Sequence, residues 1–570
     1  MSVTPTIDAV RLEIIQNALG SVVDEAFVAL MKSAFSQNIK ERRDHSTALV
    51  DARGRLIVQA RQSLPIHLGS IMGLMQALLS KVPLDSMREG DLFVANDPFE
   101  AGGTHLPDLN MAMPVFHDGR ICAFVCNIAH HADFGGMSAG SMAGGMTEIY
   151  QEGLRVPLVR LFSAGQMEQG VYDLIVINTR VPEERRGDLF AQIASARLGV
   201  RRMGEILQRH GALAVLSAFD QIVAGTSQRM RQAIARIPDG VYEFEDLMDD
   251  DGCGTLDIPI RVQVRIAGDR LHVGFDGTSP QVSGNINCTT TATLSAISYT
   301  VKALLDPEVP NNQGVLDVCE WSAPKGSIVN AAFPASVANR AHTAQRIIDA
   351  LIGALAPAMP GRAVAAANGA NTTAIFTGVD PATKRRYIYF ETLGGGFGGR
   401  AAKDGKDGVQ VHITNTSNLP VEAIEMDYPL LVESYGLVED SGGPGRHRGG
   451  TGLRRVIRPL GHECTFSGSG ERLRNPPWGL FGGGAGRCGR FVRMEPDGSQ
   501  TPLPGKPAGV PFGPEQSVMI ETPGSGGYGN PSERDMDLLE RDRSSGKFSD
   551  AFLGEHYPHH LPGSLREERQ

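Results

Sequence analysis

Histidine and aspartate residues gather in two short stretches of the chain, GGTHLPDLN at residues 102–110 and NIAHHADFGG at residues 127–136. Imidazole nitrogens and carboxylate oxygens together are ligands that suit Zn(II), Mn(II) or Fe(II). The sequence does not contain His-Glu-x-x-His, the helical motif of many zinc proteases. The two stretches therefore suggest a metal site whose ligands lie on loops.

His105 and Asp108 can bind one ion only in a particular backbone conformation. Pro107 prevents a helix at this position, and side chains three residues apart on an extended chain point to opposite sides. Both side chains reach the same ion if the backbone turns at Pro107, and the two preceding glycines permit such a close approach. A third ligand could come from His130 or His131, although paired histidines can equally be hydrogen-bonding loop residues.

A β-hairpin is expected between the two stretches. Residues 113–130, MPVFHDGRICAFVCNIAH, contain two β-rich runs on either side of Asp118-Gly119, a pair that favours a tight turn. This hairpin would bring the two histidine stretches to one end of a sheet. Residues 46–60 predict a second hairpin with its turn at residues 51–54, and residues 90–97 predict a strand.

Apolar residues spaced three and four apart predict several helices in the first part of the chain. The expected helices span residues 10–35, 66–80, 185–211 and 212–237. In the first of them, Gly20 is expected to mark a point of close packing. The last two form a helical pair of the kind that commonly closes a domain, so we place the main domain boundary near residue 237.

The expected fold class is α+β. Residues 1–237 would form a mixed N-terminal domain that carries the metal site, with helices packed on a sheet. Residues 238–530 would form a glycine-rich, β-dominated portion, with short alternating strands such as residues 260–277 and one helix at residues 343–356. Residues 531–570 are charged and polar and are expected to be a tail or an arm that clasps a partner.

Composition excludes several classes of protein. The formal net charge is −10 and no cluster of lysine and arginine is long enough to follow a phosphate backbone, so no nucleic-acid partner is expected. The chain lacks an uninterrupted apolar run of about 18 residues, and its first residues lack a basic stretch followed by an apolar core. Neither a membrane span nor a secretory signal is expected. The 7 scattered cysteines do not form a disulfide framework, which favours a reducing, cytoplasmic location.

Two glycine runs match G-x-G-x-x-G, at residues 394–399 and 484–489. The dinucleotide-binding fold needs a helix directly after the third glycine, because the helix N-terminus holds the pyrophosphate. Both runs are followed by residues that predict a turn or a strand, so we reject both as nucleotide sites. The sequence has no phosphate-loop motif, and none of its glycine-serine stretches leads into a helix as a serine nucleophile requires. Any ATP that the protein uses is expected on another chain.

Several longer stretches resemble one family. DLFVANDPFEAGGTHLPDLNMAMPVF, NIAHHADFGG, FDGTSPQVSGNIN, YPLLVESYGLVEDSGGPGRHRGGTGLRR and TPGSGGYGNP occur in this order in the chain. Together they resemble the hydantoinase B/oxoprolinase family, over about residues 11–535. Members of that family are subunits of ATP-dependent cyclic amide hydrolases, such as N-methylhydantoinase, 5-oxoprolinase and caprolactamase, or of acetone and acetophenone carboxylases.

The resemblance implies a metal centre and a partner. The family's metal ligands match His105, Asp108 and His130, and an acidic ligand nearer the N-terminus matches Asp44 in ERRDHST, which could equally be a solvated turn. His67, His131 and Asp133 would be the catalytic or supporting side chains around the ion, and His131 could instead contact substrate. The four ligands are carried over from the family's motifs. The three supporting side chains are candidates because a ligating imidazole usually donates its other N–H to a nearby carboxylate or carbonyl. The family's ATP and magnesium site lies on a hydantoinase A-type subunit of actin-like fold or on a fused N-terminal half.

The implied reaction is ATP-dependent ring opening of a hydantoin, 5-oxoproline or lactam. It would take place in a cytoplasmic hetero-oligomer of A-type and B-type chains. The partner would phosphorylate the amide carbonyl, and this chain would supply a metal-activated water. Two alternatives stay open. The chain could belong to an acetone- or acetophenone-type carboxylase, or it could be a non-catalytic scaffold whose histidines are structural. The ligand types do not choose between zinc, manganese and iron.

Overall fold

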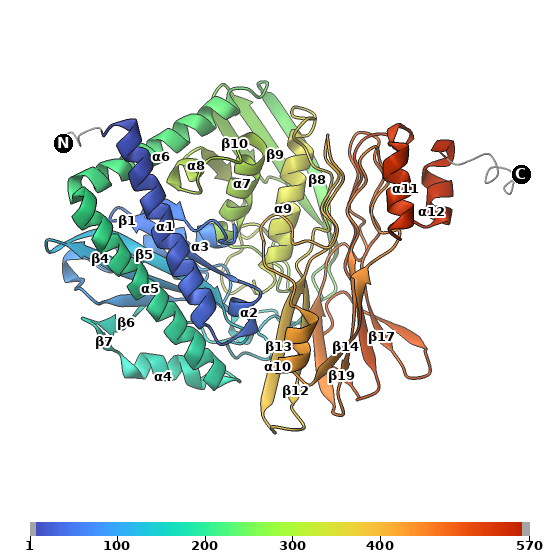
Figure 1. Cartoon of the computed structure of the whole chain (residues 1–570), viewed down its shortest axis with the longest axis horizontal. Helices are drawn as coiled ribbons and strands as arrows, with labels where there is room; N and C mark the ends of the chain where they lie inside the picture. Colours follow the sequence, from blue (N-terminus) through green and yellow to red (C-terminus); the bar gives the residue numbers. More distant parts are fainter. Residues whose placement is uncertain (1–6, 561–570) are drawn as a thin grey trace, which may run out of the picture.

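Seven antiparallel strands form the sheet that carries both histidine stretches. The computed structural model describes residues 7–560, and the sheet lies in the N-terminal part, drawn in blue and teal in Figure 1. Its strand order is β2-β1-β5-β4-β3-β6-β7, with β4 and β5 forming the expected hairpin around Asp118 and Gly119. The strands span His45–Asp51 (β1), Leu56–Gln59 (β2), Leu92–Ala95 (β3), Asp108–His117 (β4), Arg120–His130 (β5), Val159–Ser163 (β6) and Gln166–Met167 (β7).

Helices cover both faces of this sheet, and Figure 1 shows α1, α5 and α6 together over one of them. On that face Met111, Val115 and Val125 pack against α1, α4, α5 and α6, whereas Ala112 and Phe124 pack against α3 on the other face. This follows from the alternation of side chains along a strand. The helices span Ala9–Ser33 (α1), Gln37–Lys40 (α2), His67–Lys81 (α3), Gln169–Ile177 (α4), Pro182–His210 (α5) and Ala212–Ile234 (α6).

By length and composition alone, α1 is apolar enough to cross a membrane. In the structure its Ile15, Leu19 and Phe27 side chains are buried in the core. Buried core helices pass the same test, so the apolar character of α1 is weak evidence for a membrane span. An added Cβ at Gly20 would meet nothing within 4 Å, so the prediction that Gly20 marks close packing was wrong.

A second sheet, in the order β11-β10-β9-β8, follows the connection after α6. The helix α9 packs against β8 and β9, and it corresponds to the helix predicted at residues 343–356. The helix α7 was not predicted, so the expectation of a single helix between residues 238 and 530 was wrong. The elements span Gly240–Asp250 (β8), Leu256–Ala267 (β9), Arg270–Gly274 (β10), Cys319–Ser322 (β11), Thr290–Leu305 (α7), Gln313–Leu316 (α8) and Arg340–Leu355 (α9).

Two further sheets pack face to face in the C-terminal part, which is drawn in orange in Figure 1. Their strand orders are β13-β12-β16-β19 and β14-β15-β20-β17-β18. Phe376 and Phe466 from the first sheet meet Ile457 and Ile520 from the second in one apolar cluster. The elements span Thr372–Val379 (β12), Arg386–Leu393 (β13), Leu430–Leu437 (β14), Leu453–Pro459 (β15), Cys464–Ser469 (β16), Arg490–Met494 (β17), Gln500–Leu503 (β18), Val510–Phe512 (β19), Ser517–Glu521 (β20) and Val421–Asp427 (α10).

The abundant glycines of the C-terminal part let backbone pack directly on backbone. An added Cβ at Gly449 would lie 1.9 Å from the Ser525 carbonyl oxygen, and one at Gly524 would lie 1.8 Å from that of Ser441. Only glycine permits such an approach. No helix directly follows either G-x-G-x-x-G run, as the sequence predicts, so these glycines are packing positions.

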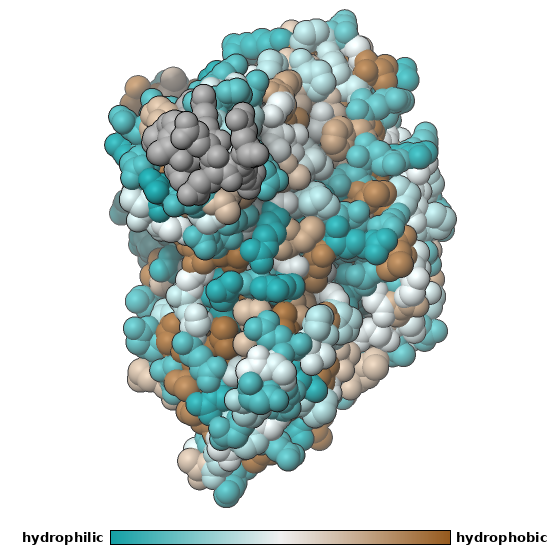
Figure 2. All heavy atoms as spheres, turned by 90° about the vertical axis from the view of Figure 1, so that its right-hand side faces the viewer, coloured by the Kyte–Doolittle hydropathy of each residue, from teal (hydrophilic) through white to brown (hydrophobic). Residues whose placement is uncertain are grey.

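The segment expected to be a polar tail or arm folds, as far as residue 560, into the helices α11 (Met536–Ser544) and α12 (Asp550–His556). Leu539, Phe548 and Tyr557 form a small buried cluster there. Figure 2 faces this side of the molecule and shows mainly hydrophilic side chains with scattered apolar ones. The rest of the predicted tail, residues 561–570, lies outside the described residues, as do residues 1–6 of the N-terminal segment.

Candidate metal centre

Three neighbouring strands bring the predicted ligands to one end of the N-terminal sheet. Asp108 is the first residue of β4 and His130 is the last residue of β5, and the two are direct partners across the hairpin. The backbone N–H of His130 donates to the carbonyl oxygen of Asp44, 3.0 Å away, just before β1 begins. The hairpin register therefore places Asp44, Asp108 and His130 at the same end of the sheet.

The backbone turns at Leu106-Pro107, as the spacing requires, and returns His105 to Asp108. His105 Nε2 and Asp108 Oδ1 lie 2.9 Å apart. Neither atom has a hydrogen-bond partner among the residues that the structure describes. Ligand atoms of His105, Asp108 and His130 all lie within 4.8 Å of one another. Three buried side chains thus bring potential metal ligands close together.

His67 is the first residue of α3 and lies beside this cluster. Its Nε2 is 3.8 Å from Asp108 Oδ1 and 3.9 Å from Asp44 Oδ1, while its Nδ1 contacts Ser46 Oγ at 2.8 Å. His67 therefore places one nitrogen near two carboxylates, one just before β1 and one at the start of β4.

Two buried arginines that the sequence did not single out hold the carboxylates in place. Arg340, the first residue of α9, contacts Asp108 Oδ2 at 2.7 Å, and its Nε donates to Thr104 Oγ1 at 3.1 Å. Arg42 lies 3.4 Å from Asp44 Oδ2. Arg42 precedes Asp44 in ERRDHST and could have been found there, whereas Arg340 is more than 200 positions from its partner.

Asn38 and Phe390 complete the surroundings of His130. Asn38 Nδ2 lies 3.1 Å from His130 Nδ1, and the amide oxygen of Asn38 accepts from Arg42 Nη1 at 2.5 Å. The His130 ring stacks on Phe390, with ring centroids 4.9 Å apart. These contacts fix the orientation of the ring, and Phe390 comes from the C-terminal part of the chain.

Burial controls the protonation of these side chains. It lowers the pKa of His67 to about 4, and it also lowers the pKa of His105 and, strongly, that of His130. Burial alone would raise the pKa of Asp108, but nearby positive charge, which the Arg340 guanidinium supplies, holds it well below its usual range. Neutral imidazoles and an ionised carboxylate are the forms that bind a metal ion. The donor set and its unpaired atoms therefore fit a divalent cation.

The structure does not bring His131 and Asp133 into this cluster. His131 Nε2 contacts Gln192 Oε1 at 2.9 Å, on the opposite side of the chain from His130. Asp133 accepts from Arg180 Nη1 at 2.8 Å and from the backbone N–H of Gly140 at 3.1 Å. Consecutive residues at a strand end point in opposite directions, so the two adjacent histidines serve different surroundings.

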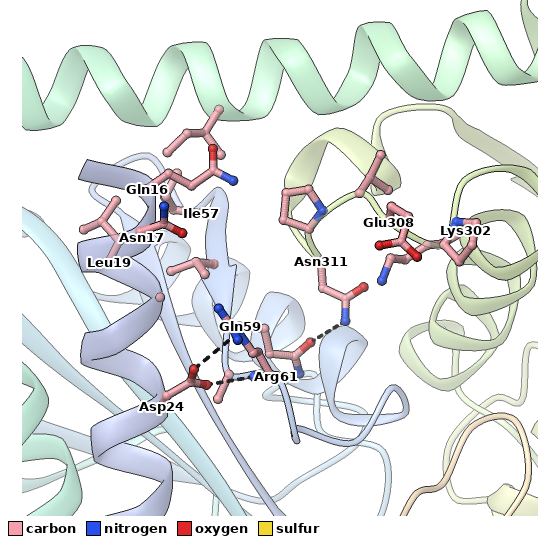
Figure 3. Close-up of a pocket in the computed structure, with 17 residues that line it drawn as sticks. Gln16, Asn17, Leu19, Asp24, Ile57, Gln59, Arg61, Lys302, Glu308 and Asn311 are labelled. Carbon is pink, nitrogen blue, oxygen red and sulfur yellow. Dashed lines mark hydrogen bonds and ion pairs between the residues drawn. The ribbon is translucent and has the colours of Figure 1, made fainter. Parts of the chain in front are cut away.

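A cavity of about 510 Å³ lies elsewhere, between α1 and residues 307–311 (Figure 3). Its side chains partly pair with one another, since Asn311 Nδ2 donates to Gln59 Oε1 at 3.5 Å and the Arg61 backbone N–H donates to Asp24 at 2.9 Å. None of the residues that line it belongs to the histidine–aspartate cluster. The cavity and the candidate metal centre are separate.

Comparison with known proteins identifies relatives over most of the chain. The family model described as hydantoinase B/oxoprolinase matches residues 8–531. The caprolactamase subunit beta of Pseudomonas jessenii is 30% identical over 95% of this chain and 94% of its own. The 5-oxoprolinase 1 of Arabidopsis thaliana is 32% identical over 92% of this chain, which spans only 42% of that longer protein.

Solved structures agree with these relatives. The crystal structure of ATP-dependent caprolactamase from Pseudomonas jessenii matches with a TM-score of 0.92 at 28% identity and covers 98% of both chains. A nucleotide-free structure of acetone carboxylase matches with a TM-score of 0.86 at 18% identity, over 96% of this chain and 79% of that one. The second likeness shows the fold alone.

Proposed function

Since the chain belongs to the hydantoinase B/oxoprolinase family, we propose that it is the B subunit of an ATP-dependent cyclic amide hydrolase that opens a hydantoin, 5-oxoproline or lactam ring. The observation that carries this proposal is the pair of unpaired atoms, His105 Nε2 and Asp108 Oδ1, 2.9 Å apart. Two buried acceptor atoms at that distance repel each other unless a cation lies between them. The name of the caprolactamase relative supports the reaction class.

Asp44, His105, Asp108 and His130 would hold a divalent ion, either zinc, manganese or iron. Such an ion would lower the pKa of a bound water to roughly 7 and so supply the nucleophile. Arg340 keeps Asp108 ionised and leaves only its Oδ1 free. His67 directs Nε2 toward both carboxylates and is the side chain best placed to exchange a proton near the substrate.

His131 and Asp133 have a supporting part in this proposal. Both follow β5 directly, and their contacts with Gln192 and Arg180 fix the backbone that leaves the strand after His130. They would act by holding His130 in place, whereas His67 would contact the substrate.

The partner would be a hydantoinase A-type ATPase in a cytoplasmic hetero-oligomer, with no nucleic acid and no membrane involved. Amide resonance makes a lactam carbonyl a poor electrophile. Phosphorylation of the carbonyl oxygen by ATP on the partner would remove that resonance and provide phosphate as a leaving group. Water would then add to the carbonyl carbon and the ring C–N bond would break, which gives a ring-opened acyl phosphate and frees the amine nitrogen. A second water would hydrolyse the acyl phosphate to the carboxylic acid and phosphate, and ADP would leave from the partner.

Reconstitution with the A-type partner tests the proposal. We expect ATP consumption that requires a cyclic amide, together with about one equivalent of divalent metal in this chain. ATP consumption that requires bicarbonate and a ketone instead would indicate a carboxylase. Full amide-dependent turnover without metal in this chain would leave it a scaffold and would end the proposal.

A further inference from the structure

A buried carboxylate, Glu152, lies behind the candidate metal centre and is not part of it. Its Oε1 accepts three hydrogen bonds from one short segment: from Ser336 Oγ, from the Val337 N–H at 2.5 Å and from the Ala338 N–H at 2.8 Å. Glu152 is completely buried, at 0% exposure. One side-chain oxygen therefore holds the backbone of residues 336–338.

That segment in turn contacts a metal ligand. His105 Nδ1 lies 2.9 Å from the carbonyl oxygen of Ala338. A carbonyl oxygen can only accept, so Nδ1 must carry the ring proton, and the lone pair of a neutral imidazole is then on Nε2. Nε2 is the atom that lies 2.9 Å from Asp108 Oδ1. The direction of one backbone carbonyl decides which nitrogen of His105 is available to a cation.

The segment that carries Glu152 is itself firmly anchored. The Met137 N–H donates to the Gln151 carbonyl oxygen at 2.7 Å, and the Leu154 N–H donates to that of Phe134 at 2.9 Å. Asn96 Nδ2 donates to the carbonyl oxygens of both Leu106 and Leu154, at 2.8 and 3.0 Å. Residues 151–154 are thus connected to the His105 turn in two ways. Asn96 joins Leu154 to Leu106, and Glu152 holds the segment whose Ala338 carbonyl contacts His105.

We propose that Glu152 is a positioning residue, which holds residues 336–338 so that the Ala338 carbonyl fixes the tautomer and orientation of His105 for metal binding. This inference rests on the metal-binding role in the proposed function. The partner of a ligating histidine's second nitrogen typically contributes 10- to 100-fold to metal affinity. Here that partner is a carbonyl whose direction depends on Glu152, so the effect of Glu152 should be transmitted through the backbone.

The test measures cobalt affinity of the full chain, by titrating metal-free protein with Co(II) and recording the visible absorption bands. Glu152→Ala removes the acceptor and should weaken Co(II) binding by about 10-fold or more. Glu152→Gln keeps an acceptor oxygen at the same reach and should restore affinity to within about 3-fold of the wild type. The band shape should change in Glu152→Ala, because His105 no longer approaches the ion in the same way, and should return to the wild-type shape in Glu152→Gln.

Two further variants separate positioning from general loss of stability. Glu152→Asp keeps the carboxyl group but is one methylene shorter, so it should behave as Glu152→Ala does and provides the comparison if the alanine variant does not fold. Glu471→Ala removes another fully buried carboxylate, which accepts from the Asp249 N–H and pairs with Lys506, and should leave Co(II) affinity unchanged.

The outcomes distinguish this inference from the proposed function. Wild-type affinity and spectrum in both Glu152→Ala and Glu152→Asp would overturn the positioning role and leave the metal centre intact. Equal loss in Glu152→Gln and Glu152→Ala would also overturn it, because the argument depends on the acceptor oxygen. Wild-type protein that binds Co(II) no better than His105→Ala would overturn the proposed metal centre itself.

Discussion

Asp108 and His130 face each other directly across the β4–β5 hairpin, and both belong to a group of ligand atoms that lie within 4.8 Å of one another. A one-residue slip of this hairpin would turn one of the two side chains to the opposite face of the sheet. The geometry of the candidate metal centre is therefore tied to the register of two long strands, and both strands are held by packing on both of their faces.

Loss of either central ligand should remove the metal. His105→Ala and Asp108→Ala should each reduce the metal content of the purified chain to background, as measured by inductively coupled plasma mass spectrometry. Turnover of the reconstituted complex should fall by more than about 100-fold, the upper limit for loss of an outer partner. His117→Ala, at the far end of β4, is the matched control and should retain both metal and turnover. Normal metal content in Asp108→Ala would contradict the proposed site.

Removal of Arg340 should destabilise the protein before any metal is added. Arg340→Ala leaves the buried Asp108 carboxylate without its partner at 2.7 Å, a change that should lower the free energy of unfolding by about 3–5 kcal/mol. Chemical denaturation of metal-free protein measures this. Arg261→Ala removes a solvent-exposed partner of Glu245 and should cost less than about 1 kcal/mol. Equal effects of the two substitutions would show that the buried pair has no special part in stability.

Because α3 lies in close contact with the loop before His105, substitution of Gly73 should destabilise the protein. An added Cβ at Gly73 would lie 2.4 Å from the Gly102 carbonyl oxygen, so Gly73→Ala must displace the helix that begins with His67. We expect a cost of about 1–3 kcal/mol and weaker metal retention. Gly20→Ala provides the opposite control, because open space surrounds Gly20 in α1 and alanine there should stabilise the helix by up to about 1 kcal/mol. A destabilised Gly20→Ala or a neutral Gly73→Ala would contradict the packing described.

Glu152 should make stability depend on pH. Burial raises the pKa of its carboxyl to about 7 from the ordinary 4.5, so between these values the folded protein keeps a proton that the unfolded chain has released. The stability that this proton contributes is fully present below about pH 4.5 and is lost as pH rises to about 7. Because glutamine does not titrate, the stability of Glu152→Gln relative to wild type should increase by up to a few kcal/mol between about pH 5 and pH 8. Denaturation of metal-free protein at both pH values measures it, and a difference that does not change with pH would contradict the assignment.

The sequence predicts the elements with strong periodicity and fails where tertiary contacts override local preference. Both N-terminal hairpins and the long helices lie close to their predicted positions. The helix α7 was missed because threonine and serine, which are poor helix formers, fill it. In the structure Ser298 and Thr300 donate to the carbonyl oxygens of Leu294 and Ala296, one turn earlier, which satisfies their hydroxyls inside a buried helix.

The C-terminal segment shows a related failure. Its charged composition predicts a tail, yet Arg534 pairs with Asp404 and Asp542, at 2.8 and 2.5 Å, and anchors the segment to the C-terminal part of the molecule. Asp404 is 130 positions from Arg534, and composition cannot reveal such a distant pairing.

The sequence by itself determined the chemistry available: imidazoles and carboxylates on either side of a hairpin, with a proline turn that brings two of them together. Local rules suffice there because the hairpin and the turn are short-range structures. Only the tertiary structure decided which side chains lie together in the candidate metal centre and which residues hold them in place. Arg340, Ala338 and Phe390 reach the centre from parts of the chain more than 200 residues away from the hairpin, and packing between sheets and helices, which no local pattern encodes, places them there.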